Sequence, residues 1–289
     1  ICKNPKIIPA LFPFFTLEKY LKSKFSEPKL QQLFGRYSTY VGGSPLSSPA
    51  LMALVWQAEA RGVWTVEGGI SSVARAIEKL AMDRGVEFNY GHRVIEIQKS
   101  NSLVNKVYLD DGTSHGADAV IFNGDPRALA TGLLGSDLRN IANKTRNANR
   151  SLSANVWGFE SKTINKNLVH HNVFFSDKVN SEFFEIEKGQ IPLNPTLYIC
   201  AQDREEPNKS QKSERFEIIL NAPPLSKRNQ NKEDFEICKS VTLECFKNFG
   251  LNFQVDLERR NLTTPKDFND LFPATEGSLY GQSPHGMMA

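Results

Sequence analysis

The spacing of apolar and polar positions divides the chain into a helical beginning, an alternating middle and a strand-rich remainder. Residues 1–62 are predicted to be mostly helical, and the clearest helix there has the body ALMALVWQAEA. Pro49 suits the first position of this helix, so Ser47 or Ser48 is the expected N-cap and Gly62 the expected end.

Residues 63–150 alternate between the periods of strands and helices, which is typical of a module that completes an α/β nucleotide-binding domain. A helix with one apolar face is predicted over residues 71–85. Short runs of β-branched and aromatic residues around it predict strands. The expected strands cover residues 62–66, 86–90, 92–97, 106–113 and 117–123, and a further helix covers residues 127–134.

The pattern changes again beyond residue 150, toward longer strands separated by polar stretches. We expect strands over residues 153–160, 194–202 and 215–224, and a helix over residues 233–250 that returns the chain to the core. These elements predict a mixed α/β (α+β) fold with interleaved domains. The expected division is into residues 1–62, 63–150, 151–272 and 273–289.

Composition and charge narrow the possible functions. The 289 residues are 40% hydrophobic and 10% aromatic, which is enough for a sizeable core. The 35 basic and 32 acidic residues are mixed along the chain and leave a net charge of only +3. Because no basic stripe is present, we expect no nucleic-acid partner.

The four cysteines indicate a reducing compartment. Cys2, Cys200, Cys238 and Cys245 lack CxxC spacing and are too few for a disulfide framework. Cys238 and Cys245 are seven residues apart and are expected to share one helix face as a structural pair. With no histidine near that pair in the sequence, we expect no metal site.

The segment over residues 33–69 follows no simple helix or strand period, although it is rich in aromatics and glycines. No GxGxxG turn, which would hold a dinucleotide pyrophosphate at a helix N-terminus, occurs in the 289 residues. The chain begins at Ile1 and not at Met. We therefore expect an internal piece of a longer protein.

Several strings resemble the bacterial carotenoid desaturases, the phytoene-desaturase-like branch of FAD-dependent oxidoreductases. They are FGRYSTYVGGSP, EARGVW, VEGG, GHRVIEI and ADAVIFNGDPRALATGLLG. The hydroxycarotenoid 3,4-desaturase (methoxyneurosporene dehydrogenase) subgroup is the most similar. The resemblance implies a partial FAD-binding Rossmann-like domain interleaved with a sheet-and-helix substrate domain.

The resemblance also implies which residues lie near FAD. Val94 matches a position whose backbone contacts the adenine edge. Asn123, Gly124 and Asp125 follow the predicted strand over residues 117–123, where a backbone can approach a ligand and a helix N-terminus is available for negative charge. The last two candidates are the adjacent glycines Gly68 and Gly69. A tight turn explains one glycine, and a crowded neighbour, such as a flavin, would explain the second.

Glu59, Arg61 and Arg36 form the candidate catalytic cluster. Glu59 stands near the carboxyl end of its predicted helix, where the dipole disfavours an anion, so Arg61 or Arg36 is the expected partner. The alternatives are a structural ion pair and a catalytic role. In the catalytic role, Glu59 accepts a proton while a hydride leaves the neighbouring carbon for the flavin.

A polyene substrate offers almost no group for hydrogen bonding, so tunnel shape must supply specificity. The candidate walls are Phe34, Tyr37, Tyr40 and Trp56, for which ordinary core packing is the alternative. His285 is the candidate partner of a substrate hydroxyl, and its alternative is an exposed loop histidine.

The resemblance implies an enzyme that introduces a C=C bond into an acyclic carotenoid, at the 3,4 position of a 1-hydroxylated end group. The alternatives are a phytoene desaturase or related carotenoid oxidase or isomerase, and a catalytically inactive piece. The implied electron acceptor is a quinone or oxygen. The implied location is cytoplasmic, peripheral to the inner membrane, where residues 7–15 with nearby lysines suit a membrane surface.

Overall fold

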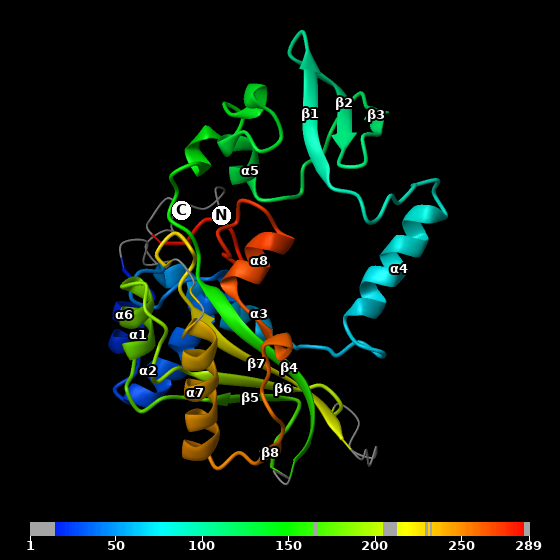
Figure 1. Cartoon of the computed structure of the whole chain (residues 1–289). Helices are drawn as coiled ribbons and strands as arrows, with labels where there is room; N and C mark the ends of the chain where they lie inside the picture. Colours follow the sequence, from blue (N-terminus) through cyan, green and yellow to red (C-terminus); the bar gives the residue numbers. More distant parts are fainter. Residues whose placement is uncertain (1–14, 164–166, 205–212, 229–230, 232, 286–289) are drawn as a thin grey trace. The chain divides into compact units, whose positions relative to one another are not determined.

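The computed structural model describes residues 15–163, 167–204, 213–228, 231 and 233–285. The chain divides into two compact units (Figure 1). The sheet unit consists of residues 1–56 and 148–289, and the middle unit consists of residues 57–147. The four-part division expected from the sequence stays a prediction.

The sheet unit is built on six strands that all pair in antiparallel fashion. Five of them follow the order β5-β6-β7-β4-β8, and β9 pairs with β4. Their bounds are β4 (Ser153–Thr163), β5 (His171–Phe174), β6 (Leu197–Ala201), β7 (Glu214–Ala222), β8 (Phe253–Gln254) and β9 (Leu262–Thr263). Strand β5 is therefore an edge strand.

One face of this sheet forms the main hydrophobic core. Alternate residues of the strands point to it, among them the fully buried Trp157, Ile199 and Ile218. Helix α7 (Glu233–Asn248) packs there through Cys238, Val241, Cys245 and Phe246. The predicted helix over residues 233–250 and the three predicted strands in this region are thus confirmed.

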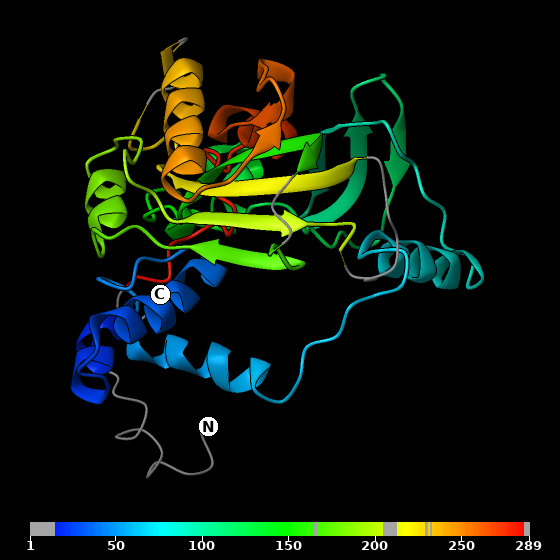
Figure 2. The same cartoon turned by 90° about the horizontal axis from the view of Figure 1, so that it is seen from below.

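The opposite face of the sheet is covered by the first helices of the chain. Figure 2 shows α1 (Leu17–Lys24) and α2 (Pro28–Gly35) on one side of the sheet and α7 on the other. A 3-10 helix, Arg36–Val41, continues α2 directly. The shorter elements of the unit are the 3-10 helix Ala50–Met52, α6 (Ser181–Glu187), the 3-10 helix Arg259–Asn261 and α8 (Pro265–Leu271). Helix α3 (Ala53–Glu59) begins in this unit and ends in the middle unit.

The expected helix after Pro49 is present, but its start differs from the prediction. Pro49 has the extended conformation of an N-cap, with ψ at 150°, so the helix begins at Ala50. Ser48 is fully buried and is not the cap. The α-helical part ends at Glu59, three residues before Gly62.

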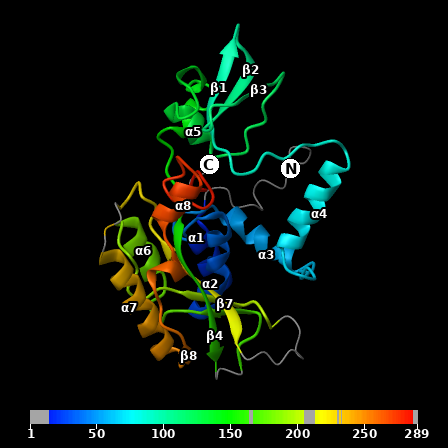
Figure 3. The same cartoon turned by 45° about the vertical axis from the view of Figure 1, so that its right-hand side comes forward.

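The middle unit contains a three-stranded antiparallel sheet packed beside a short helix (Figure 3). Ile97 packs with Leu129, Leu134 and Leu138 in a small core. The elements are α4 (Ser71–Met82), β1 (Val94–Ser100), β2 (Leu103–Leu109), β3 (Ser114–Gly116), α5 (Pro126–Thr131) and the 3-10 helices Ser136–Leu138 and Asn143–Thr145.

Three expected strands of the middle region are wrong. Residues 62–66, 86–90 and 117–123 form no strand, and Ile121 is 96% exposed where a buried strand was predicted. A strand needs a neighbour for its backbone hydrogen bonds, and no described strand pairs with these residues. The mixed α/β class itself is confirmed by the helices and sheets of both units.

No helix in the described part of the chain has the length and apolar character that crossing a membrane requires.

Candidate functional site

Four aromatic side chains of the sheet unit form a continuous row, which we call the aromatic row: Phe34, Tyr37, Tyr40 and Trp56. Ring centroids are 6.3 Å apart for Phe34 and Tyr37, 5.2 Å for Tyr37 and Tyr40, and 5.6 Å for Phe34 and Trp56. Tyr37 and Tyr40 lie on a 3-10 helix, whose three residues per turn place every third side chain on one side. The candidate walls are therefore brought together.

The row is not simply core. Tyr40 is 47% exposed and Trp56 is 43% exposed, while Phe34 and Tyr37 are half-buried. Large aromatic rings that contact each other and remain partly open to solvent are typical of an apolar binding surface.

Arg36 lies next to the aromatic row in sequence and points to the sheet. Its guanidinium carbon is 5.9 Å from the ring centroid of Tyr198 on β6. Burial lowers the pKa of Arg36, and the nearby Glu182 acts in the opposite direction. The carboxylate facing Arg36 is thus Glu182, a residue that the sequence analysis missed.

Glu182 is a buried acid in the first turn of α6. Burial raises its pKa, and this is opposed by hydrogen bonds from Thr196 and by Arg36. The backbone N–H of Thr196 donates to Glu182 Oε2 at 2.8 Å. A small pocket is lined by Arg36, Glu182 and Thr196 together with Gln32, Gly35 and Pro45. No motif marks Glu182, because only the fold brings it to Arg36.

His285 is half-buried and makes a defined contact. The backbone N–H of Ser44 donates to His285 Nε2 at 3.0 Å. Burial lowers the pKa of His285, consistent with a ring nitrogen that accepts a hydrogen bond. The alternative of a loop histidine exposed to solvent is therefore wrong, while a role toward substrate stays a prediction.

Glu59 is the last residue of α3, at the carboxyl end as predicted. Its backbone carbonyl accepts from Gly62 N–H at 2.8 Å, and Arg61 lies exposed in this turn. The side chain of Glu59 is half-buried. Its catalytic role and its pairing with Arg61 stay predictions.

Val94 begins the edge strand β1 of the middle unit. Its neighbour Arg93 accepts a backbone hydrogen bond from Asp110 at 2.9 Å, and the next cross-strand pair is Val94 with Leu109. Antiparallel pairs alternate, so the backbone N–H and C=O of Val94 point away from β2. This is the geometry that a backbone contact to an adenine edge requires.

Gly68 and Gly69 form a tight turn before α4. Their φ angles are +76° and +81°, and Gly69 N–H donates to the carbonyl of Val66 at 2.8 Å. Both glycines are therefore explained by the left-handed backbone region. The turn thus accounts for both glycines without a crowded neighbour, and proximity to a cofactor stays a prediction.

Asn123, Gly124 and Asp125 lead into α5. The Asp125 side chain accepts from Arg127 N–H at 2.9 Å and caps the helix. This carboxylate already places negative charge at the N-terminus, so the end is less available to an anionic ligand than expected. A Cβ at Gly124 would meet the ring of Phe122, which explains the glycine locally.

The two units thus each hold part of the predicted set. The sheet unit carries the aromatic row, Arg36 and His285, and the middle unit carries Glu59, Arg61 and the candidate cofactor residues. The outward backbone of Val94 leaves its N–H and C=O open to a ligand, and the roles of Val94, Asn123, Gly124 and Asp125 toward a cofactor stay predictions.

Solved structures share this fold. An oxidoreductase from Methanosarcina mazei has a TM-score of 0.50 and 14% identity, covering 90% of this chain and 53% of that chain. A sequence model described as flavin containing amine oxidoreductase matches residues 12–156. The chain belongs to the flavin containing amine oxidoreductase family.

Curated relatives match nearly the whole chain. A hydroxyneurosporene desaturase from Cereibacter sphaeroides is 46% identical over 287 residues, covering 99% of this chain and 58% of the relative. A 1-hydroxycarotenoid 3,4-desaturase from a Flavobacterium species is 30% identical, covering 98% of this chain and 58% of the relative. The resemblance to carotenoid desaturases is therefore confirmed, and the chain spans somewhat more than half the length of these relatives.

Proposed function

We propose that the protein is an FAD-dependent carotenoid desaturase that introduces a C=C bond at the 3,4 position of a 1-hydroxylated acyclic carotenoid. The observation that carries this proposal is the aromatic row, a partly exposed series of touching rings in a chain similar to desaturases of such substrates. A polyene lacks polar handles, so it is recognised by apolar shape.

The proposed roles of individual residues follow from their positions. Val94 contacts the adenine edge through its outward backbone groups, and Gly68 and Gly69 allow close approach to the cofactor. A bound flavin supplies the hydride acceptor. Glu59 accepts the proton from the adjacent substrate carbon, which completes the loss of two hydrogens.

His285 would recognise the hydroxyl group of the substrate. Its Nε2 accepts from Ser44 N–H, so the neutral ring carries its proton on Nδ1. Nδ1–H can then donate to the hydroxyl oxygen. This role distinguishes a 1-hydroxylated carotenoid from phytoene, which has no hydroxyl.

The partners proposed for the whole protein are a membrane surface and an electron acceptor, either a quinone or oxygen. A lipid-soluble substrate favours a cytoplasmic enzyme attached peripherally to the inner membrane. The expected interfacial segment, residues 7–15, lies outside the described residues except for Phe15, which is 47% exposed.

The test is to express the protein at its full natural length in hosts that accumulate either a 1-hydroxycarotenoid or phytoene. Pigments are measured by absorbance and mass spectrometry. Loss of two hydrogens from the 1-hydroxycarotenoid, with phytoene unchanged, is the expected result. Conversion of phytoene would move the function to phytoene desaturation, and no conversion of either would leave an inactive product.

Glu59→Gln tests the proposed base. The variant should lose turnover while it retains FAD, measured by the flavin absorbance of the purified protein. Glu87→Gln, which changes an exposed acid of the same unit outside the candidate site, is the matched control and should remain active. Full turnover by Glu59→Gln would remove Glu59 from the mechanism.

A further inference from the structure

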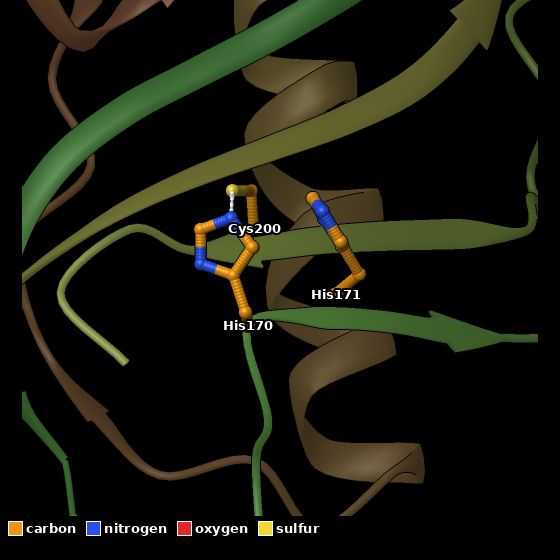
Figure 4. A group of neighbouring side chains, drawn as sticks. All are labelled: His170, His171 and Cys200. Carbon is orange, nitrogen blue, oxygen red and sulfur yellow. Dashed lines mark hydrogen bonds between the residues drawn. The ribbon is translucent and has the colours of Figure 1, made fainter. Parts of the chain in front are cut away.

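Two adjacent histidines meet a cysteine at the edge of the large sheet, although 30 positions separate His170 from Cys200 in sequence. His170 and His171 stand at the start of β5, and Cys200 lies on β6, where it pairs directly with His171. One ligand atom from each side chain can be chosen so that all three lie within 4.8 Å of one another (Figure 4). The two imidazole rings have centroids 4.2 Å apart.

The hydrogen bonds of His170 orient one nitrogen toward the cysteine. His170 Nδ1 lies 3.1 Å from the carbonyl oxygen of Ala201. A carbonyl only accepts, so Nδ1 carries the proton and Nε2 keeps a lone pair. His170 Nε2 in turn lies 3.8 Å from Cys200 Sγ, as the dashed line in Figure 4 shows.

His171 has a similar arrangement. Its Nδ1 lies 2.7 Å from the hydroxyl oxygen of Tyr198, which stacks nearby on β6. A phenol oxygen can accept from Nδ1–H, which leaves the lone pair of His171 Nε2 for a metal ion. An imidazole with one nitrogen held by a backbone carbonyl or another polar group is the usual arrangement of a histidine that binds metal through its other nitrogen.

The spacing of the three groups is close to that of a metal site. Imidazole nitrogen and thiolate ligands of a tetrahedral zinc ion lie about 3.5 Å from each other. The distance of 3.8 Å between His170 Nε2 and Cys200 Sγ is near this value. The ligand atoms of the three side chains lie within 4.8 Å of one another, and rotation of the side chains can shorten the longer distances.

The neighbouring strand adds charge of the right sign. Glu217 on β7 stands directly opposite Cys200 in the register, so its side chain is on the same face of the sheet. A negative group on this face favours a bound dication.

We propose that His170, His171 and Cys200 form a zinc-binding site, with a solvent water as fourth ligand. Thiolate and imidazole together suit this ion. Binding converts the Cys200 thiol to a zinc thiolate and releases its proton to solvent. The bound ion joins the edge strand β5 to β6 through side chains and protects Cys200 from alkylation. The site is independent of the proposed desaturation.

The test uses the full-length protein, reduced and freed of metal with a chelator. Zinc is titrated in competition with a chromophoric chelator, and alkylation of Cys200 is followed by mass spectrometry. We expect one zinc per chain and protection of Cys200. Replacement of zinc by Co²⁺ should add a thiolate-to-metal charge-transfer band.

Variants separate the site from other binding. His171→Ala changes an exposed side chain and should weaken zinc binding about tenfold or more, with loss of protection at Cys200. Cys200→Ser should abolish the Co²⁺ thiolate band. His115→Ala, at an exposed histidine of β3, is the matched control and should bind as the parent does. Absence of stoichiometric zinc binding, or unchanged binding in His171→Ala, would overturn the proposal.

Discussion

His285 accepts a hydrogen bond from the backbone of Ser44, although 241 positions separate the two residues. The contact joins the segment VGGSP, which contributed to the resemblance, to residues 281–285 near the other end of the chain. Gly43 is part of the same junction, because a Cβ there would collide with Ser48 Oγ and approach Pro284. Two motifs from opposite ends of the chain are therefore one structural feature of the sheet unit.

This contact predicts a dependence of stability on pH. Burial lowers the pKa of His285 below its ordinary value of 6.5. Below pH 6.5 the unfolded chain therefore binds a proton that the folded chain does not, and stability falls as pH falls toward the folded pKa. Urea unfolding at about pH 8 and about pH 5.5 measures the loss.

The variant His285→Gln isolates this contribution, since glutamine keeps an acceptor that does not titrate. It should lose less stability than the parent over the same pH interval. His115→Gln, at an exposed site, should behave as the parent. Equal losses in the parent and His285→Gln would contradict the assignment.

Trp157 predicts a measurable buried hydrogen bond. It is fully buried, and its Nε1 donates to Thr242 Oγ1 at 2.9 Å. Thr242→Val leaves this N–H with only the weak sulfur acceptor of Cys238 and should cost about 1–3 kcal/mol of unfolding free energy. In a double-mutant cycle, Thr242→Val should cost less in a Trp157→Phe background. Additive effects would show that the hydrogen bond contributes nothing.

Arg36 and Glu182 predict a partial rescue. Arg36→Met leaves the buried Glu182 without its cation and should lower the unfolding free energy by about 3 kcal/mol. Adding Glu182→Gln removes the uncompensated acid and still accepts from Thr196 N–H, so stability should recover in part. Urea unfolding of both variants measures their free energies of unfolding. A double variant less stable than Arg36→Met would contradict the pairing of Arg36 with Glu182.

Gly277 and Gly250 form a matched pair of left-handed glycines. Their φ angles are +74° and +64°, but only at Gly277 would a Cβ collide with a backbone atom, the carbonyl oxygen of Pro265. Gly250→Ala should cost about 1–2 kcal/mol from backbone strain alone. Gly277→Ala should cost roughly 2 kcal/mol more. Thermal and urea unfolding measure the difference in stability between the two variants. An equal loss of stability in both would contradict the predicted collision at Gly277.

Local patterns were sufficient for elements whose packing partners are close or whose periodicity is strong. Helix α7 and strands β4, β6 and β7 follow from apolar spacing that the core then buries. Strand β5 was missed because HNVF is short and its two polar residues are followed by two apolar ones, so it lacks the alternation of a half-buried strand. The predicted strand over residues 117–123 failed for the opposite reason, since an apolar run without a hydrogen-bonding neighbour is not a strand.

In the candidate site, too, local sequence patterns identified some residues and missed others. Tyr37 and Tyr40 were found because aromatic residues stand out in a sequence, and the 3-10 helix placed them together. Glu182 and the group of His170, His171 and Cys200 were missed, because each depends on pairing between segments that no local signal connects.

The sequence by itself determined the mixed α/β class, the resemblance to carotenoid desaturases and the aromatic residues that line the candidate surface. These properties reside in composition, periodicity and contiguous motifs. Tertiary structure alone decided that Arg36 faces Glu182, that His285 meets Ser44, and that two histidines lie beside Cys200. The physical reason is that burial and strand register, which set pKa values and bring side chains together, arise only when distant segments pack.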